Sequence, residues 1–374
     1  MDIAFIDVTV TRSYGGLQTA VWQTAAALAE RGHRVTVYGG DGPIRPDLGG
    51  RAVSVKTFPF TPRERYPNLG TRFRKLAERH SFLRAAQADF DAAEHDWAIV
   101  TKPYDFLWPW RSRAATRFAF LSGGTDFFLG DRRLAEHVDV FLACSQFNAW
   151  QLYGHFGRSA AVVYNGVDVN SFNPACRDPG LREQLGIAPD EVVFAFAGRL
   201  VGWKGVHLAV QALATAPLAG LKAKLLVVGD GAALAGLRRD AAAAGVAERV
   251  LFHAAVAHHE LPRIYASADV GIFPSLGDEA FGITVAEAMA CGLPVVAAYN
   301  GGIPEVVGNE GSCGQLFTVG DVLGCARAMA ELARLSDEQR RQRGAAARQR
   351  VTERYTWALA AERVEAAMLA TAPR

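Results

Sequence analysis

The residues with the clearest chemical potential lie in the segment EAFGITVAE, which begins at Glu279 and ends at Glu287. The pattern predicts one carboxylate in a loop, a Phe-Gly step at a helix start and a second carboxylate inside that helix. The backbone N–H groups of Gly282, Ile283 and Thr284 would then lack helical partners. Because the helix dipole favours negative charge at this end, the segment predicts an anion-binding site.

An anion held between two carboxylates is an uncommon requirement. A ligand with phosphate at its centre and hydroxyl-rich sugars at both ends meets it, and a nucleotide-sugar has this composition. The alternative is that Glu279 is a solvated loop charge and that Glu287 lies on the polar face of an amphipathic helix. The strand predicted at 270–273 and the strand that follows Gly292 favour a position at the edge of a cleft.

A second segment with phosphate-binding character is GRLVGWKG, from Gly198 to Gly205. It follows a strand predicted at 192–197, and ligands of open α/β sheets bind at the carboxyl ends of strands. The Arg199 guanidinium and the Lys204 ammonium can together neutralise a diphosphate. Either cation taken alone would be interpreted as a surface charge on a turn.

Two further glycine loops are candidates for ligand contact. Gly15 and Gly16, in the sequence RSYGG, precede a helix predicted over 17–31. Two glycines allow the backbone to approach an anion or a sugar closely, although a plain strand-to-helix turn is the alternative. The GDG sequence that begins at Gly229 lacks the third glycine of a dinucleotide fingerprint, because Leu234 occupies its place. We therefore expect Gly229 to line the pocket for a base.

The bulk composition limits the class of protein. A chain of 374 residues exceeds one ordinary core and predicts two domains. A hydrophobic fraction of 50% with a formal net charge of +2 predicts a soluble globular protein that does not bind nucleic acid through its global charge. The chain has no run of about eighteen apolar residues and no basic N-terminal region. Its five scattered cysteines predict reduced thiols, so we expect a cytoplasmic protein.

Short apolar runs alternate with helical segments along the whole chain. In the first half the predicted strands are 3–8, 35–38, 97–101, 118–122, 140–143 and 162–164. In the second half they are 192–197, 224–228, 250–253, 270–273, 295–298 and 314–317. This alternation is typical of doubly wound parallel sheets, and a turn-rich tract at 170–180 predicts the connection between domains. The predicted fold is α/β, with two Rossmann-like domains facing across a cleft.

Four features together resemble a known family: Gly15-Gly16, Asn165-Gly166-Val167-Asp168, Gly198-Arg199 with Lys204-Gly205, and the Glu279-x7-Glu287 spacing. They resemble the retaining GT-B glycosyltransferases of family 4, also called glycosyl transferases group 1. The resemblance covers nearly the whole chain. It implies an acceptor-binding domain at 1–165 and a nucleotide-sugar-binding domain at 166–350. It also implies a C-terminal helix at about 351–374, around Trp357, that packs back on the first domain.

The resemblance also implies roles for single residues. Arg199 and Lys204 would clamp the diphosphate, Glu287 would bind the ribose, and Glu279 would bind the hydroxyls of the donor sugar. Sugar and phosphates would be contacted through the backbone of four residues: Phe281, Gly282, Ile283 and Thr284. The implied reaction moves a sugar from a UDP- or GDP-linked donor to an acceptor hydroxyl with retention, in glycan, glycolipid or metabolite biosynthesis. No metal and no other cofactor would be required, since two cations hold the diphosphate.

One position departs from the family pattern. Many relatives carry a histidine in a sequence similar to HGTD, and this chain has Gly123 in that place. Asp126 is retained and would bind acceptor or donor hydroxyls, with a helix N-cap as the alternative. The missing imidazole leaves a second function open, which is an inactive nucleotide-sugar-binding scaffold of the same fold. The intact Glu279, Arg199 and Lys204 argue against it.

Two segments outside these motifs carry clustered charge. Residues 51–84 hold nine basic and two acidic residues, interleaved with apolar side chains that include Leu69 and Phe73. They predict an amphipathic element that touches the inner face of an anionic membrane, a solvated face beside the acceptor cleft, or a site for an anionic acceptor. The sequence HHE at 258–260 predicts a loop before a helix that begins near Leu261, in preference to a zinc site.

Overall fold

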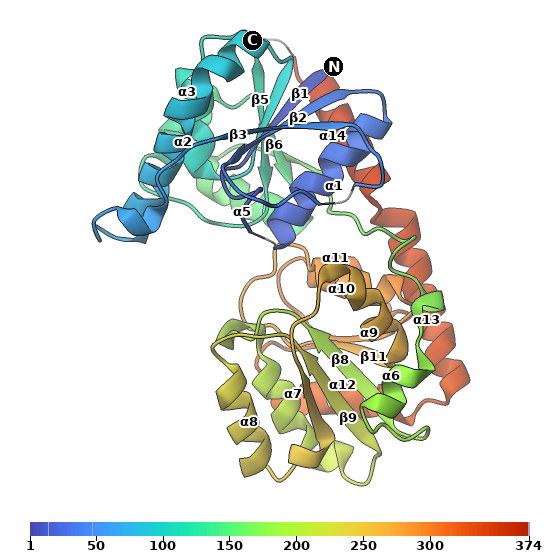
Figure 1. The fold of residues 1–374 in the computed structure, drawn as a ribbon. Helices are drawn as coiled ribbons and strands as arrows, with labels where there is room; N and C mark the ends of the chain where they lie inside the picture. The colour runs from blue at the N-terminus through green and yellow to red at the C-terminus, as the bar shows by residue number, and fades with distance from the viewer. Residues whose placement is uncertain (14, 47, 373–374) are drawn as a thin grey trace. The chain divides into compact units, whose positions relative to one another are not determined.

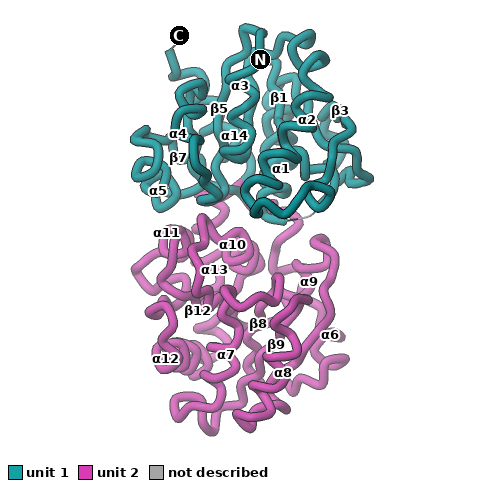
Figure 2. Tube along the Cα trace, turned by 90° about the vertical axis from the view of Figure 1, so that its left-hand side faces the viewer, with its two compact units in different colours: residues 1–166, 357–374 teal, residues 167–356 magenta. Residues whose placement is uncertain are grey.

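The computed structural model describes residues 1–13, 15–46 and 48–372. The chain divides into two compact units, one of residues 1–166 with 357–374 and one of residues 167–356 (Figure 2). The predicted C-terminal helix is therefore divided. Helix α13 (Asp337–Arg354) ends inside the second unit, whereas α14 (Trp357–Ala370) belongs to the first.

The break between these two helices has a local cause. The Tyr355 carbonyl accepts a hydrogen bond from the Val167 N–H at 2.8 Å, and Val167 forms a parallel bridge with Thr356. The segment 355–356 is thus extended backbone paired with residue 167, which prevents α13 from continuing. The chain passes from one unit to the other at 166–167 and again at 356–357, and both places adjoin this short pairing.

The described residues of the first unit form a seven-stranded parallel sheet in the order β3-β2-β1-β4-β5-β6-β7 (Figure 1). Its strands are β1 (Asp2–Ile6), β2 (Arg34–Gly40), β3 (Val53–Phe58), β4 (Trp97–Val100), β5 (Arg117–Ser122), β6 (Val140–Ala143) and β7 (Ala160–Val162). Its helices, besides α14, are α1 (Gly16–Glu30), α2 (Thr71–Ala93), α3 (Leu107–Arg111), α4 (Asp131–Leu134) and α5 (Gln146–Phe156).

Alternation along the strands builds two cores on the two faces of this sheet. Ile3 and Phe5 of β1 pack with α1 and α14 on one face. Ala4 and Ile6 pack on the other face, with apolar residues of α2, α3 and α5. Successive side chains of a strand point to opposite faces, so a continuous apolar run is what a doubly covered strand requires.

Two predictions for the first unit were wrong. The stretch 51–84 is not one amphipathic element, because it contains β3, the 3-10 turn η1 (Arg63–Arg65) and the first half of α2. Strand β7 lies at 160–162 instead of 162–164. Strands β3 and β7 lie at the two edges of the sheet, where half-buried residues give a weak apolar signal.

The described residues of the second unit form a six-stranded parallel sheet in the order β10-β9-β8-β11-β12-β13. Its strands are β8 (Val192–Ala197), β9 (Ala223–Val228), β10 (Val250–His253), β11 (Val270–Phe273), β12 (Val295–Ala298) and β13 (Gly314–Phe317). Its helices, besides α13, are α6 (Pro179–Gln184), α7 (Val206–Leu213), α8 (Leu234–Ala243), α9 (Leu261–Ser267), α10 (Ile283–Ala290), α11 (Ile303–Val307) and α12 (Val322–Arg334).

The predicted fold class, two Rossmann-like doubly wound units, is confirmed. In each sheet the strand order reverses once, between β1 and β4 and between β8 and β11. Ligands of such sheets bind outside the carboxyl ends of the strands at this switch point. In the second unit the two loops at that place are 198–205 and 274–282. No helix among the described residues is both long and apolar enough to cross a bilayer.

Candidate active site

The central contact at the second switch point is an ion pair between Lys204 and Glu279. The Lys204 Nζ lies 2.5 Å from the Glu279 Oε1, and the Ser275 hydroxyl donates to the same oxygen at 2.9 Å. Each charged side chain is 16% exposed, so the pair is accessible from solvent without being fully hydrated. The Lys204 ammonium also lies 4.5 Å from the centroid of the Trp203 ring, a cation–π contact.

The pairing depends on a close approach of two loops. Gly205 has φ +68°, and a Cβ there would lie 1.9 Å from the Pro274 carbonyl oxygen, so only glycine fits. The carbonyl of Trp203 accepts backbone hydrogen bonds from Leu276 and Gly277 at 2.7 and 3.2 Å. These contacts join the loop after β8 to the loop after β11, and they place position 204 beside position 279.

A third loop supports Glu279. The buried Asn300 amide, just after β12, donates to the carbonyls of Ser275 and Gly277 at 3.1 and 2.7 Å. The Gly302 N–H donates to the Glu279 carbonyl at 2.8 Å. The carboxylate is therefore held by three consecutive strand ends of the sheet, and its direction is fixed by backbone contacts.

Helix α10 begins immediately after this carboxylate. Its N-cap, Gly282, has φ +97° and no side-chain cap. The N–H groups of Ile283 and Thr284 have no backbone acceptor among the described residues, since the helical bonds begin with Val285 and Ala286 donating to the Gly282 carbonyl. The predicted helix start and its free amides are confirmed. The Phe281 side chain is buried and packs edge-on against Tyr355, so it serves the core.

The second carboxylate of the motif has a partner that the sequence did not predict. Glu287 lies in the second turn of α10 and is buried, with its residue 3% exposed. Its Oε1 lies 2.7 Å from the His258 Nε2. That hydrogen bond raises the pKa of His258 above its ordinary value, against the effect of burial, and the charge of Asp168 adds to the shift. The segment predicted as a loop is the 3-10 turn η8 (His258–Glu260), which leads into α9 at the predicted Leu261. The contact of its first histidine is new.

The remaining predicted donor residues border the same loops. Arg199 is exposed and forms no ion pair within the described part of the chain. Gly198 and Gly229 end neighbouring strands, and a Cβ on Gly229 would lie 2.0 Å from the Gly198 carbonyl oxygen. Packing of the two strand ends therefore explains this glycine without any ligand.

In the first unit, Asp126 is an ion-pair partner and not a helix cap. It contacts the Lys75 Nζ at 2.6 Å and accepts from the Tyr104 hydroxyl at 3.3 Å. Helix α4 begins only at Asp131, with Gly130 as its N-cap, so the N-cap alternative is wrong. Burial would raise the pKa of Asp126, but the hydrogen bond and charge of Lys75 outweigh it and lower that pKa.

A buried charge network occupies the switch point of the first sheet. The Thr101 hydroxyl donates to Asp7 at 2.6 Å, joining the ends of β4 and β1. Arg79 of α2 forms an ion pair with Asp105 and lies 3.8 Å from Asp7. Burial raises the pKa of Asp105 to about 6, against the attraction of Arg79. The sequence did not reveal this network, because its members come from separate elements.

The first glycine loop leads into α1 as predicted. Gly15 is the N-cap and has extended backbone with φ 172°, and it offers no side-chain cap. The Gln18 amide donates to the Thr9 hydroxyl at 2.9 Å, which ties the first turn of α1 to the loop after β1. Gly16 is exposed at the start of the helix, and Tyr14 of the same motif lies outside the described residues.

Comparison with known proteins decides the family. The model described as "Glycosyltransferase Family 4" matches residues 14–171, and the model described as "Glycosyl transferases group 1" matches residues 178–350. A D-inositol 3-phosphate glycosyltransferase of Mycobacterium marinum is 31% identical over 347 residues, which cover 83% of this chain and 72% of that protein. The chain is a family 4 glycosyltransferase.

A second relative and a solved structure are also similar to this glycosyltransferase. A D-inositol 3-phosphate glycosyltransferase of Xylanimonas cellulosilytica is 36% identical over 241 residues, which cover 61% of this chain and only 56% of that protein. A structure of Anabaena HepE in complex with UDP and glucose has a TM-score of 0.79 at 23% identity, covering 99% of this chain and 100% of that one. This second likeness shows the GT-B fold.

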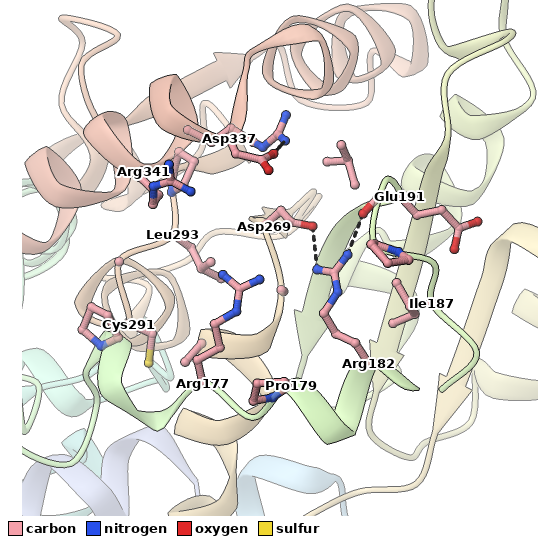
Figure 3. A pocket seen from close by; sticks show the side chains of 18 of the residues that line it. Arg177, Pro179, Arg182, Ile187, Glu191, Asp269, Cys291, Leu293, Asp337 and Arg341 are labelled. Atoms are coloured by element: carbon pink, nitrogen blue, oxygen red, sulfur yellow. Dashed lines mark hydrogen bonds and ion pairs between the residues drawn. The ribbon is translucent and has the colours of Figure 1, made fainter. Parts of the chain in front are cut away.

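A pocket of this glycosyltransferase lies at the amino ends of the strands of the second sheet, opposite the carboxyl ends that carry the candidate donor site. It has a volume of about 910 Å³ and is bordered by residues at the amino ends of β8, β11 and β12. Glu191, Asp269 and Leu293 are among these lining residues (Figure 3). Its Arg182 bonds to the Asp269 carboxylate at 2.9 Å and to the Glu191 carbonyl at 2.7 Å. None of the predicted site residues lines it, so it is separate from the candidate donor site.

The basic stretch 51–84 of this glycosyltransferase is partly neutralised, mostly by carboxylates from outside the stretch. Five of its cations form ion pairs: Arg51 with Glu30, Lys56 with Asp89, Arg63 with Glu64, Lys75 with Asp126, and Arg79 with Asp105. Exposed apolar side chains remain, with Leu69 at 70% and Phe73 at 41% exposure. Among the described residues there is no group of three or more His, Cys, Asp or Glu side chains that could hold a metal.

Proposed function

We propose that this glycosyltransferase moves a sugar from a UDP- or GDP-linked donor to an acceptor hydroxyl, with retention of configuration at the anomeric carbon. The observation that carries the proposal is the Lys204–Glu279 pair beside the free N–H groups of α10. A cation, a carboxylate and a helix N-terminus together match a diphosphate and the hydroxyls of the sugar attached to it.

Each group has a part in binding the donor. The Lys204 ammonium has three N–H donors and uses one of them on Glu279, so two remain for phosphate oxygens. Arg199 has no ion pair within the described residues and can turn its planar fork toward the second phosphate. Glu279 accepts hydrogen bonds from donor-sugar hydroxyls, and Glu287 accepts them from the ribose.

In the proposed reaction the bond between the anomeric carbon and the phosphate oxygen breaks, while a bond from that carbon to the acceptor oxygen forms on the same face. The acceptor's proton passes to the departing phosphate oxygen. Lys204, Arg199 and the amides of α10 stabilise the negative charge that grows on the leaving diphosphate. No metal is part of this proposal.

The acceptor is proposed to bind the first unit near Lys75 and Asp126. An ammonium and a carboxylate at 2.6 Å can exchange their mutual hydrogen bond for bonds to a phosphate and a hydroxyl of the acceptor. The M. marinum relative is named for an acceptor of this kind, D-inositol 3-phosphate. An inositol phosphate is therefore the first acceptor to test, with lipid-linked polyols second.

The donor is tested by calorimetric titration with UDP-sugars, GDP-sugars and the free diphosphates. We expect saturable binding of one base class, and a loss of roughly 10-fold or more in Lys204→Ala, since a charge-assisted hydrogen bond contributes about 1.5–3 kcal/mol. Lys222→Ala is the matched control, because Lys222 pairs with Asp190 on the exposed surface. No binding of any nucleotide at millimolar concentration would overturn the proposal.

The stereochemistry is tested on the product of the reaction. An α-linked donor should give an α-linked product, read from the one-bond and three-bond couplings of the anomeric proton by NMR. A β-linked product would overturn retention while leaving the transferase assignment intact.

Contact with an anionic membrane is a separate part of the proposal. Leu69, just before α2, and Phe73, in its first turn, are exposed. Arg72 lies between them in the sequence and has no ion pair within the described residues. We expect the protein to float with vesicles that contain phosphatidylglycerol, and the double variant Leu69→Ser, Phe73→Ser to remain in solution. Wild-type protein that stays in solution would remove membrane contact from the proposal.

A further inference from the structure

The carboxylate assigned to the ribose is covered in this structure. The Glu287 side chain is 4% exposed, whereas that of His258 is 51% exposed and lies on the solvent side of the pair. His258 contacts the Glu287 Oε1 at 2.7 Å, and Oε2 has no hydrogen-bond partner among the described residues. The imidazole also packs against Phe172, with 5.3 Å between the ring centroids.

A ribose presents two neighbouring hydroxyls, and a carboxylate receives such a pair with one hydroxyl on each oxygen. Each carboxylate oxygen can accept two hydrogen bonds, so the contact with His258 alone does not exhaust Glu287. Access is what excludes the ribose: the Glu287 side chain is 4% exposed, and the more exposed imidazole of His258 lies against its Oε1, so a ribose reaches the carboxylate only if the imidazole moves.

We propose that His258 is a gating residue of the donor site: it occupies the Glu287 carboxylate in the donor-free protein, and the donor's ribose displaces it. This inference rests on the proposed function, because it takes Glu287 as the ribose ligand. It adds a residue outside the Glu279–Glu287 motif that sets how tightly the donor binds, and it makes donor affinity depend on the protonation of one imidazole.

The surrounding groups leave His258 as the residue that titrates at this place. Tyr265 of α9 and Cys291 at the end of α10 face Glu287, and burial raises the pKa of both, so they stay neutral near pH 7. Asp168 faces His258 and favours its charged form, as Glu287 does. Cys176 in turn faces Cys291 and raises its pKa further.

The direction of the pH effect follows from linkage. In the donor-free protein the Glu287 hydrogen bond raises the pKa of His258 above 6.5. Once the ribose has displaced the imidazole, that pKa returns toward 6.5, so donor binding releases a proton. Donor affinity is then unaffected well above the raised pKa and falls as the pH drops toward 6.5. The loss approaches roughly tenfold per pH unit at its steepest, the limit for one proton.

The test is donor affinity as a function of pH, measured by calorimetry from about pH 5.5 to about pH 8.5. UDP-glucose and GDP-mannose are the probes, because a diphosphate esterified at both ends lacks the phosphate monoester that titrates near pH 6. We expect affinity to fall with acid in the wild type and to stay within about twofold in His258→Gln, whose amide cannot gain a proton. His259→Gln is the control, since it changes the exposed neighbour and leaves the pair intact.

A second readout follows the imidazole itself. The pKa of His258, measured by NMR on protein labelled at histidine, should fall when the donor saturates the site. A His258 pKa that is the same with and without donor, or a His258→Gln profile that matches the wild type, would overturn the gate. A donor-free His258 pKa at its ordinary value would also overturn it.

Failure of the proposed function is recognised separately. If no sugar nucleotide binds the wild type at any pH, the donor assignment fails first. In that case Glu287→Gln still tests the pair, because it should return the pKa of His258 toward 6.5. If it does not, the His258–Glu287 contact is absent in solution and the gate fails on its own ground.

Discussion

Gly301 lies directly against the backbone of Glu279. A Cβ built on Gly301 would lie 2.1 Å from the Glu279 carbonyl oxygen, and the next residue, Gly302, donates its N–H to that oxygen at 2.8 Å. The turn after β12 thus packs directly against the backbone of Glu279 and supports it. It consists of glycine because no other residue can come this close.

Replacement of this glycine should displace Glu279. In Gly301→Ala the methyl group must push the Glu279 backbone away, so we expect kcat/KM to fall by about tenfold or more. Gly311→Ala is the matched control. Gly311 has φ +72° and so carries the same left-handed strain of roughly 1–2 kcal/mol, but nothing lies within 4 Å of its Cβ position. Equal activity in the two variants would show that the contact does not position Glu279.

The two carboxylates of the motif should affect different constants, Glu279 the kcat of the reaction and Glu287 the Kd of the nucleotide. Glu279 is proposed to contact the donor sugar, so Glu279→Gln should lower kcat by about 10²–10³ and leave the Kd of the free nucleoside diphosphate unchanged. Glu287 is proposed to contact the ribose, so Glu287→Gln should raise the Kd of the free nucleoside diphosphate. Steady-state kinetics and calorimetric titration of both variants give the comparison. The reverse pattern would exchange the two roles.

The sequence predicted the second sheet well because its strands are short apolar runs with buried residues on both faces. Strand β8, for example, lies at the predicted 192–197 and is buried at every position. Strand β3 was missed because it is half-buried at the edge of the first sheet, and its sequence VSVKTF carries too few apolar residues to mark it.

The candidate site was predictable in part. Strand-end loops with charged residues located Lys204 and Glu279, but their contact depends on how three loops pack, which no spacing encodes. Asn300 and His258 were missed for the same reason. One signal was available, since the Gly301-Gly302 pair follows a predicted strand in the way that Gly15-Gly16 does. It could have indicated a third loop at the carboxyl edge.

The returning helix should stabilise the first unit. Trp357 is 8% exposed and packs in the same core as α1 and the sheet of that unit. Trp357→Ala should lower the free energy of unfolding of the first unit by about 3–5 kcal/mol. Leu369→Ala, on the exposed face of the same helix, should change it by less than about 0.5 kcal/mol. Hydrogen exchange resolved by peptide gives the measurement, and equal protection loss in β8 and β9 would contradict the assignment of α14 to the first unit.

The buried network around Arg79 should make the stability of the first unit depend on pH. Burial raises the pKa of Asp105 to about 6 from its ordinary 3.8, with the charge of Asp7 adding to the shift against Arg79. Between these two values the folded state holds a proton that the unfolded state has lost. The stabilising contribution is therefore complete below about 3.8, declines as the pH rises, and is lost above about 6.

Thermal unfolding at about pH 4.5 and about pH 7 tests this direction. The wild type should lose on the order of 1–3 kcal/mol across that window through Asp105, whereas Asp105→Asn should lack this component. Asp190→Asn is the control, because Asp190 forms an exposed pair with Lys222 and lies outside the network. Other groups titrate in the same window, so the readout is the difference in slope between the variant and the wild type. Equal slopes would show that Asp105 is already ionised in the folded protein at pH 4.5.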